Sequence, residues 1–199
     1  SVRSAEPAPM PVAGKNVSAA VESILTARGI NYRPSMQITA VEPGQLHFGD
    51  EEERTDLLIY MPPITAPRVI ADSPLAKADG WIHADVNTLK TGFDNVYAIG
   101  DNTQIVLGIG KPLPRAGVFA HGQALAVADS IIAKISGKVS VGQFNGHGGC
   151  FIETGHGKAA YGSGNFYADP APAINMKPPS RRGHWCKVAF ELNVMKRLL

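Results

Sequence analysis

The sequence predicts an α/β fold, and three observations support that prediction. A short apolar strand, Val96–Gly100, leads into Asp101, so a carboxylate stands at the carboxyl end of a strand, where open α/β sheets bind ligands. An Ala-rich run over 115–136 carries apolar residues at helical spacing after Pro114 and predicts a buried helix. Short apolar segments also alternate between residues 30 and 60, a pattern typical of the end of a nucleotide-binding domain.

Composition limits the classes that need to be considered. With 199 residues, 44% hydrophobic and 18% charged, the chain can bury one good core or two small ones. The formal net charge of +2 is spread along the chain, which argues against a nucleic-acid partner. No apolar run reaches the ~18 residues of a transmembrane helix. The chain starts without Met and without a signal-type segment, so we expect its true amino terminus elsewhere or removed.

The first part of the chain predicts alternating short elements. Residues 1–13 contain three prolines and read as an extended connector. Ser18 is expected to cap a short amphipathic helix that stops at Gly29. A polar turn is expected at 49–54, followed by a buried strand at Leu57–Tyr60. The other expected extended segments are Ile30–Tyr32, Ile38–Val41 and Leu46–Phe48.

The last part of the chain predicts a hairpin and a tail helix. Phe151–Thr154 and Lys158–Tyr161 flank a Gly-His-Gly turn, and Asn165–Ala168 is a further strand candidate. The proline-rich stretch 170–179 reads as an extended link. Over 180–199, with Ser180 as the cap, the pattern predicts an amphipathic helix. Its apolar stripe comprises Trp185, Val188, Ala189, Leu192, Met195 and Leu199.

The Gly-Asp strand followed by a small-residue helix resembles the second flavin-binding motif of the flavoproteins with two dinucleotide-binding domains. Among them, the run from Pro114 to His121 resembles the Pro-Lys-x-Gly pattern of the sulfide:quinone oxidoreductases and their flavocytochrome c relatives, with Arg115 in place of Lys. Gly80–Thr91 resembles the segment that precedes this motif in the same group. The resemblance covers nearly the whole chain, but only about the second half of such an enzyme.

This resemblance implies a fold and a domain order. The fold would be a partial Rossmann-like flavoprotein that lacks the first Gly-rich βαβ unit and has an α+β carboxyl-terminal region. Residues 1–63 would end the second, NAD-type domain, and 64–138 would return to the FAD-binding domain. Residues 139–199 would form the carboxyl-terminal hairpin and the tail helix.

The resemblance also implies FAD as cofactor. Gly100 and Asp101 would meet its ribityl chain, and Arg115 would lie near the flavin or the quinone. The helix start, Ala116, Gly117 and Val118, would meet the pyrimidine side of the flavin.

The glycine motif that seats a dinucleotide pyrophosphate is not found in the sequence. Gly-x-Gly-x-x-Gly must lie between a strand and a helix, but Gly108–Gly110 and Gly162–Gly164 lack the third glycine and the helix. The adenosine end of FAD therefore has no site here. The sequence reads as half an enzyme, which would need a missing amino-terminal half or a second copy of itself.

Cys150 is the candidate redox residue. A free Cys at a strand start can be a small buried hydrophobe, but its surroundings resemble the region that supplies the carboxyl-side redox cysteine in sulfide:quinone oxidoreductases. In that reading, electrons pass from sulfide through the cysteine and FAD to a quinone. Cys186 is read as structural, with a bridge to Cys150 as the minor alternative.

The histidines offer no convincing metal site. His121 is expected to pack within its helix, and His147 and His156 lie in Gly-rich turns without Cys or carboxylate partners at ligand spacing. Glu153 receives no role. We therefore expect no bound metal.

Two other functions stay open at this stage. A type II NADH:quinone oxidoreductase shares the Gly-Asp strand and the tail helix but needs no cysteine. A non-catalytic module that docks a partner chain is the other alternative. The apolar stripe of the tail over 180–199 reads as core packing, but the resemblance implies a tail on a membrane surface, which Trp185 and its basic neighbours suit. The protein would then be peripheral to a membrane or soluble. The sequence does not decide between the cytoplasm and the periplasm of a prokaryote.

Overall fold

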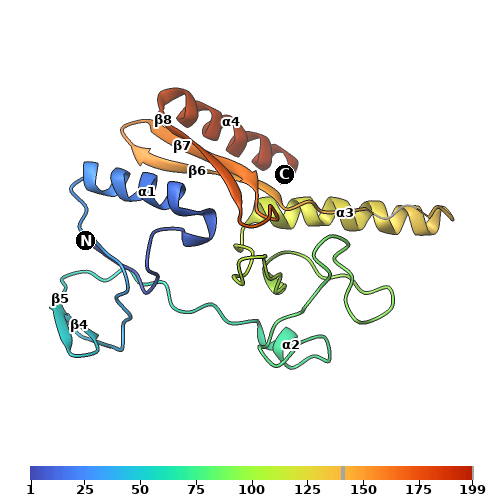
Figure 1. The fold of residues 1–199 in the computed structure, drawn as a ribbon, viewed down its shortest axis with the longest axis horizontal. Coiled ribbons are helices and arrows are strands. Elements are labelled where there is room, and N and C mark those ends of the chain that lie inside the picture. The colour runs from blue at the N-terminus through green and yellow to red at the C-terminus, as the bar shows by residue number, and fades with distance from the viewer. Residues whose placement is uncertain (140–141, 199) are drawn as a thin grey trace. The chain divides into compact units, whose positions relative to one another are not determined.

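The computed structural model, drawn in Figure 1, describes residues 1–139 and 142–198. It divides into two compact units, Ser1–Ile64 and Thr65–Leu199. Each unit contains helices and β-strands, in agreement with the predicted α/β class.

In the first unit, helix α1 spans Lys15–Ala27. It begins earlier than predicted because Gly14 is its cap, and Ser18 lies buried inside the helix, where its N–H donates to the Gly14 carbonyl at 3.1 Å. The proline-rich start is also not wholly extended. Pro11–Ala13 forms the 3-10 helix η1, since a proline in a first turn removes an N–H that has no partner there anyway.

Short strands complete the first unit. A parallel pair is formed by β1 and β2, and an antiparallel sheet has the order β3-β4-β5. Their bounds are β1 Val2–Arg3, β2 Tyr32–Arg33, β3 Ala40–Glu42, β4 Gln45–Phe48 and β5 Glu51–Arg54. The Glu-rich run that the sequence predicted as a turn is therefore mostly a strand.

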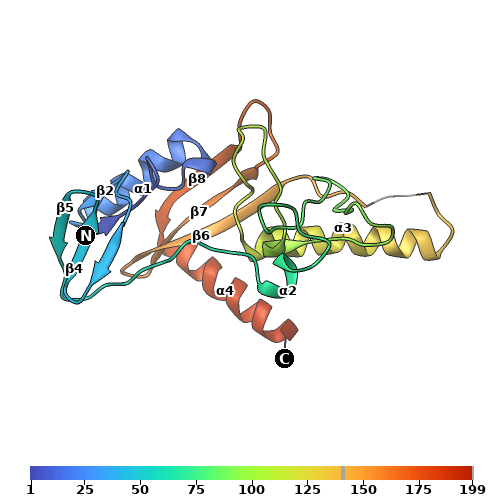
Figure 2. The same ribbon diagram turned by 90° about the horizontal axis from the view of Figure 1, so that it is seen from below.

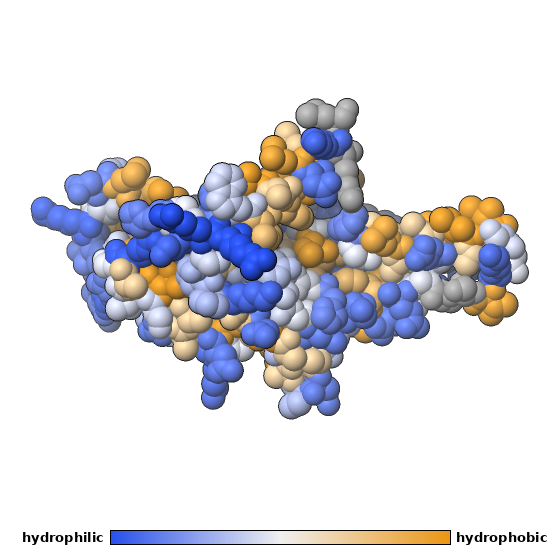
Figure 3. Space-filling model, turned by 90° about the horizontal axis from the view of Figure 1, so that it is seen from above, coloured by the Kyte–Doolittle hydropathy of each residue, from blue (hydrophilic) through white to orange (hydrophobic). Residues whose placement is uncertain are grey.

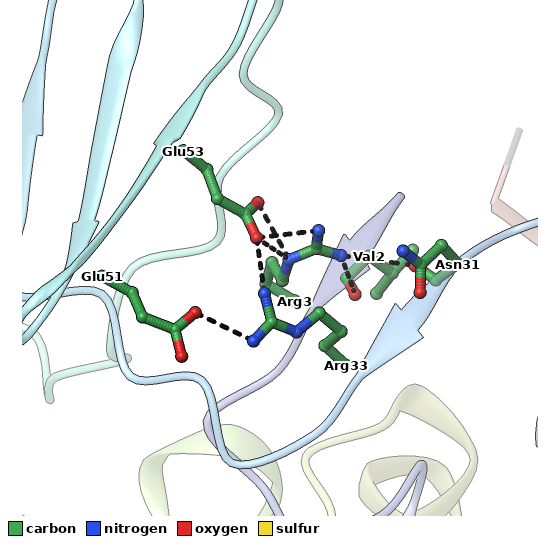
Figure 4. A network of polar contacts seen from close by, with 6 residues as sticks. All are labelled: Val2, Arg3, Asn31, Arg33, Glu51 and Glu53. Atoms are coloured by element: carbon green, nitrogen blue, oxygen red, sulfur yellow. Dashed lines mark hydrogen bonds and ion pairs between the residues drawn. The ribbon is translucent and has the colours of Figure 1, made fainter.

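Charge pairing explains why this acidic run is a strand. The Glu53 carboxylate accepts hydrogen bonds from Arg3 Nε and Arg33 Nη1, each at 2.9 Å, and Glu51 accepts one from Arg33 Nη2 at 2.9 Å, as Figure 4 shows. The hydrogen bond from Arg3 is the main cause of a lowered pKa at Glu53. Two arginines of the parallel pair thus hold the β4-β5 hairpin through its acidic side chains.

The expected buried strand Leu57–Tyr60 is not formed. These residues lie outside every strand, and Leu57 and Ile59 are 78% and 89% exposed. The prediction was wrong because an apolar strand needs a neighbouring strand to bond its backbone, and none of the described residues supplies one.

The second unit opens with the short helix α2, Arg68–Ala71, and a long irregular segment. The predicted strand Val96–Gly100 is reduced to a single antiparallel bridge between Tyr97 and Lys90. The 3-10 helix η2, Gly100–Asn102, follows it directly.

Helix α3, Gly117–Ile135, confirms the predicted long helix. It ends through Ser136 and Gly137, whose φ of 67° is the left-handed conformation of a helix terminus. One face is buried, with positions spaced three, four or seven apart. That face consists of Phe119, Gln123, Ala126, Ser130 and Ala133.

The carboxyl-terminal region is an antiparallel sheet of order β6-β7-β8, with helix α4 against it (Figures 1 and 2). Strands β6, His147–Gly155, and β7, Lys158–Asn165, confirm the predicted hairpin and extend it. Since β7 ends at Asn165, the chain does not continue as the expected strand Asn165–Ala168. Strand β8, Ala173–Ser180, replaces the expected proline link; it is an edge strand, where proline is tolerated.

Helix α4, Arg181–Leu198, confirms the predicted tail helix. Its start is capped as expected, since the Gly183 N–H donates to Ser180 Oγ at 3.0 Å. Much of the predicted apolar stripe faces outward: Trp185, Leu192 and Met195 are 68%, 60% and 54% exposed. Leu199, also assigned to that stripe, lies outside the described residues.

Candidate functional site

The site is built where Gly100 meets helix α3. Gly100 has a φ of +68°, and a Cβ there would lie 3.2 Å from Ala120 Cβ, so both the backbone and the space require glycine. Its N–H donates to Oε1 of the fully buried Gln123 at 2.6 Å. These contacts fix the segment before Asp101 against the first turns of α3.

Asp101 presents an available carboxylate. The residue is exposed at the start of η2, and its side-chain oxygens have no hydrogen-bond donor among the residues that the structure describes. Its backbone carbonyl is occupied, because it accepts a hydrogen bond from Arg115 Nε at 3.1 Å. The carboxylate can therefore accept hydrogen bonds from ligand hydroxyl groups.

Arg115 is held by the protein on several sides. Besides the Asp101 carbonyl, its Nη2 donates to Gln104 Oε1 at 3.3 Å. Its guanidinium carbon lies 3.8 Å from the ring centroid of the buried Trp81, a cation–π arrangement. These contacts link the loop that carries Asp101 to the start of α3.

The start of α3 offers free hydrogen-bond donors. Ala116 is extended and provides no side-chain cap, and the N–H groups of Gly117 and Val118 have no acceptor within the described part of the chain. A helix start with open N–H groups and a partial positive charge attracts electron-rich ligand atoms. A small hollow here is lined by Gly100, Asp101, Thr103, Ile105, Leu113, Pro114, Arg115, Ala116, Phe119 and Gln123.

Strand register places Cys150 on the sheet face that meets α3. A Cβ on Gly148 would lie 2.2 Å from Phe119 Cε1, so Gly148 faces α3. Cys150, two residues further along β6, shares that face. Phe151 instead faces α4, with its ring centroid 6.1 Å from that of Phe190. The first turn of α3 and Cys150 therefore lie on the same side of the sheet.

Cys150 is an exposed free thiol opposite Gly162 of β7. A Cβ at Gly162 would meet only Ile174 Cγ2, at 4.0 Å, so the flank of the cysteine is open. Partial burial raises the pKa of the Cys150 thiol. Without a further positive field it is therefore a protonated, weak nucleophile at neutral pH.

The bridge between Cys150 and Cys186 is not formed, since both thiols are free. Cys186 belongs to α4, and α4 packs on the sheet face of Phe151, opposite to Cys150. A redox disulfide at Cys150 would need a cysteine other than Cys186.

The histidine predictions had mixed outcomes. His121 is exposed on α3 rather than packed. His156 sits at the β6-β7 turn with a φ of 53°, and His147 opens β6. Within residues 1–139 and 142–198, no three side chains of His, Cys, Asp or Glu gather as a metal site would require.

Sequence reasoning missed the neighbours that position the site. Trp81 and Gln123 hold Arg115 and Gly100, and the spacing of Gln123 on the buried stripe of α3 was the available signal. Glu153, given no role, accepts a hydrogen bond from His184 Nδ1 at 2.8 Å and lies 3.7 Å from Lys187 Nζ. Its contacts fasten α4 to β6, away from the site.

Sequence comparison finds relatives among quinone-linked oxidoreductases. No family model matches the chain. It is 25% identical over 146 residues to mitochondrial sulfide:quinone oxidoreductase of Mus musculus, covering 71% of this chain and 30% of that protein. It is 32% identical over 108 residues to the Schizosaccharomyces pombe counterpart, covering 54% and 22%. It is also 31% identical over 137 residues to type II NADH:quinone oxidoreductase of Haemophilus influenzae, covering 65% and 30%.

Structural comparison gives the same family of folds. The sulfide:quinone oxidoreductase of Aquifex aeolicus superposes with a TM-score of 0.84 and 20% identity, over 98% of this chain and 48% of that one. A ferredoxin reductase of Rhodopseudomonas palustris matches with a TM-score of 0.58 and 20% identity, over 83% and 41%. The chain spans 22% to 30% of the length of the curated relatives. In sequence and in fold the chain is therefore similar to the sulfide:quinone oxidoreductases, over only part of their length.

Proposed function

We propose that this chain is the carboxyl-terminal part of an FAD-dependent enzyme that oxidises sulfide and reduces a quinone, and that it is inactive alone. The observation that carries the proposal is the grouping of three features on one side of the β6-β7 sheet. These are the free Asp101 carboxylate, the open start of α3 and the exposed Cys150 thiol.

The residues present fit one end of FAD. The Asp101 carboxylate can accept hydrogen bonds from ribityl hydroxyl groups, and Gly100 keeps the backbone beside it close to α3. The N–H groups of Gly117 and Val118, next to Ala116, can donate to the carbonyl oxygens of the flavin pyrimidine ring. Arg115 would act as a positioning residue, because its guanidinium already holds the Asp101 loop. When bound, FAD would supply two-electron redox chemistry.

Cys150 would carry the sulfur chemistry. In the oxidised enzyme it would share a disulfide with a cysteine from the part of the protein outside this chain. Hydrosulfide would attack one sulfur, so that the S–S bond breaks, a persulfide forms on one cysteine and a thiolate is released on the other. Because burial raises the pKa of the Cys150 thiol, a thiolate at this position needs the positive field of the α3 start.

The outward face of α4 supports attachment to a membrane surface. Trp185, Leu192 and Met195 are exposed there, and Arg181 and Arg182 lie at the start of the same helix. Apolar and aromatic side chains flanked by basic residues suit the headgroup region of a bilayer. Such a location would bring the protein to the layer in which quinones dissolve.

Flavin binding tests the cofactor part of the proposal. The chain should quench FAD fluorescence in a weak, saturable titration, and Asp101→Ala should weaken binding about tenfold, the loss expected for a charged hydrogen bond. Asp94→Ala, an exposed aspartate in a loop away from the hollow, serves as the matched control. Absence of saturable binding by the wild-type chain, or equal binding by both variants, would remove Asp101 from the site.

A second candidate function is type II NADH:quinone oxidation, which the 31% identity to the Haemophilus influenzae enzyme favours. That reaction needs no cysteine. The two candidates separate in the full-length parent carrying Cys150→Ser, with Cys186→Ser as control. Loss of sulfide-dependent quinone reduction in the Cys150 variant alone supports the thiol route, and undiminished NADH-dependent reduction with no sulfide activity in any form supports the alternative.

A further inference from the structure

The second unit contains a cavity that shares none of its described lining residues with the hollow at Asp101. Its volume is about 400 Å³, and its walls come from segment 90–97 and from residues 130–139 at the carboxyl-terminal end of α3. Lys134 Nζ of α3 donates to Asn95 Oδ1 in the turn of that segment, so the two walls are tied together. A cavity of this volume falls within the range of small-molecule sites.

Positive charge is in excess on the walls of this cavity. Three ammonium groups line it, those of Lys90, Lys134 and Lys138, against one carboxylate, that of Asp94. None of the three lysines forms an ion pair among the described residues, although the Asp85 carboxylate lies close enough to Lys90 to interact with its charge. Hydrophilic and apolar side chains are both visible on the part of α3 at the right of Figure 3. Ammonium groups in excess over carboxylates attract an anion.

The end of α3 does not need these lysines to complete its hydrogen bonds. Backbone N–H groups of residues 136–138 already donate to the carbonyls of residues 132–134. The helix dipole favours a cation near this end, which accounts for Lys134 and Lys138 singly. It does not account for Lys90, which reaches the same cavity from the opposite wall. Three ammonium groups that converge from two walls therefore point to a ligand rather than to helix capping.

Aromatic side chains complete the lining. Phe93 is 48% exposed and lines the cavity together with Tyr97. Neither ring packs on another aromatic ring in the part of the chain that the structure describes, so the exposed Phe93 ring is free to stack on a flat ligand group. Lysine ammonium groups bind phosphates, and aromatic side chains stack on nucleobases. The two features together fit a nucleotide.

We propose that the cavity between segment 90–97 and the end of α3 binds a nucleoside diphosphate. Its phosphates would contact the three lysines, and its base would lie against Phe93. Gly117 at the start of α3 and Lys134 are separated by about 25 Å of helix, so this site is distinct from the hollow at Asp101. The proposal needs neither FAD nor sulfide and goes beyond the proposed function.

Isothermal titration calorimetry on the chain, with inorganic pyrophosphate and ADP as probes, tests the proposal. Both probes should bind saturably to one site, and added NaCl should weaken the binding. Lys138→Gln should weaken both probes about fivefold, the loss expected for one charge contact near the surface. Lys158→Gln, an exposed lysine of β7 outside the cavity, is the matched control and should change neither affinity.

Two further variants separate the charge from the ring. Asp94→Asn should tighten both probes about fivefold, because a repelling carboxylate is removed, and a gain of affinity does not arise from misfolding. Phe93→Ala should weaken ADP at least about fivefold and leave pyrophosphate unchanged, because only ADP carries a base. Absence of saturable binding would overturn the proposal, as would equal effects of Lys138→Gln and Lys158→Gln, or equal effects of Phe93→Ala on the two probes.

A phosphate on a lipid headgroup is the other source of the same chemistry. Binding to anionic phospholipid vesicles that Lys138→Gln abolishes, without binding of free ADP, would assign the lysines to a membrane and overturn the proposal. Saturating pyrophosphate occupies the cavity, so FAD titrated in its presence reports the hollow alone, and Asp94→Ala is then neutral toward FAD. Failure of FAD binding at the hollow leaves the ADP measurements intact, so the two hypotheses fail separately.

Discussion

Helices α3 and α4 are both exposed on one side, but they differ in what holds the other side. The inner face of α3 consists of packed rings and buried hydrogen bonds: Phe119 lies 4.9 Å from Phe166 between ring centroids, and Gln123 bonds Gly100. The inner side of α4 contacts the sheet partly through half-exposed ionic pairs, of which His184 with Glu153 is the shortest to β6. The difference indicates that α3 is built as an interior element and α4 as a surface element.

The outer faces show the same contrast. Along α3 the exposed residues Leu125, Ile132 and Ile135 are apolar and the acidic Asp129 lies beside them, whereas α4 mixes Trp185 and Leu192 with basic residues. A mainly apolar surface suits a protein interior, and apolar side chains mixed with basic ones suit the boundary between lipid and water. The two helices therefore expose apolar surface for different reasons.

The largest expected effect is the loss of an aromatic ring at the inner face of α3. Phe119→Ala would remove contacts to Phe166, Phe144 and the backbone at Gly148, and should lower the free energy of unfolding by about 3–5 kcal/mol. Chemical denaturation followed by circular dichroism measures it. Phe190→Ala on α4, whose residue is 55% exposed, should cost no more than about 1 kcal/mol. Equal costs would break the distinction between the two helices.

A smaller effect is expected from the buried amide on α3. Gln123→Leu would leave the Gly100 N–H without its acceptor, and the free energy of unfolding should fall by about 1–3 kcal/mol. The matched control is Asn193→Leu, at an exposed position of α4, which should change stability by less than about 0.5 kcal/mol. Faster amide exchange at Gly100 in the Gln123→Leu variant would show that the loss of stability arises at this hydrogen bond. Unchanged exchange there would mean that Gln123 does not position the Asp101 segment.

The ion pairs of Glu153 with His184 and Lys187 of α4 should contribute still less to the free energy of unfolding. Glu153→Gln would remove the charge that His184 and Lys187 face, at side-chain exposures of 31% and 27%. Exposed pairs contribute about 0–1 kcal/mol, so we expect a loss within that range that shrinks in high salt. Thermal unfolding at low and high NaCl measures it, with Glu22→Gln on the exposed side of α1 as control. A loss that persists in high salt would mean that Glu153 acts through packing.

The sequence predicted the elements that a local residue pattern specifies. Helix α3, the β6-β7 hairpin and the Ser180 cap follow from apolar spacing, from glycines in a turn and from a polar residue before a helix. The prediction failed where contacts with residues far away in the sequence determine the local structure. The run that became β5 looks like a turn until Arg3 and Arg33 are brought to its glutamates, and Leu57–Tyr60 reads as a buried strand although no described strand pairs with it.

The site shows the same division. Gly100 and Asp101 could be named as candidates because a Gly-Asp pair after an apolar run is a local signal. The supporting contacts of Arg115 with Trp81 and of Gly100 with Gln123 span 34 and 23 positions, and no local pattern reveals them. The face on which Cys150 lies also depended on the register of β6 against β7, which the sequence leaves open.

The smallest expected effect concerns the two thiols, which lie on opposite sides of the sheet. Burial raises the pKa of the Cys150 thiol in the folded chain, so the folded protein holds that proton more tightly than the unfolded chain does. The contribution of this thiol to stability is therefore fully present below the ordinary thiol pKa and is lost as pH rises through the raised pKa of the folded chain.

Thiol labelling measures the same shift. In a Cys186→Ser background, labelling of Cys150 by iodoacetamide should set in at higher pH in the folded chain than in the urea-unfolded chain, because the thiolate is the reactive form. Gly162→Val, which fills the open flank beside the thiol, should slow labelling at every pH, while Gly92→Val, in equally open space, should not. If labelling set in at lower pH in the folded chain than in the unfolded chain, the positive field of the α3 start would outweigh burial. Cys150 would then be a stronger nucleophile in this chain than its surroundings on β6 indicate.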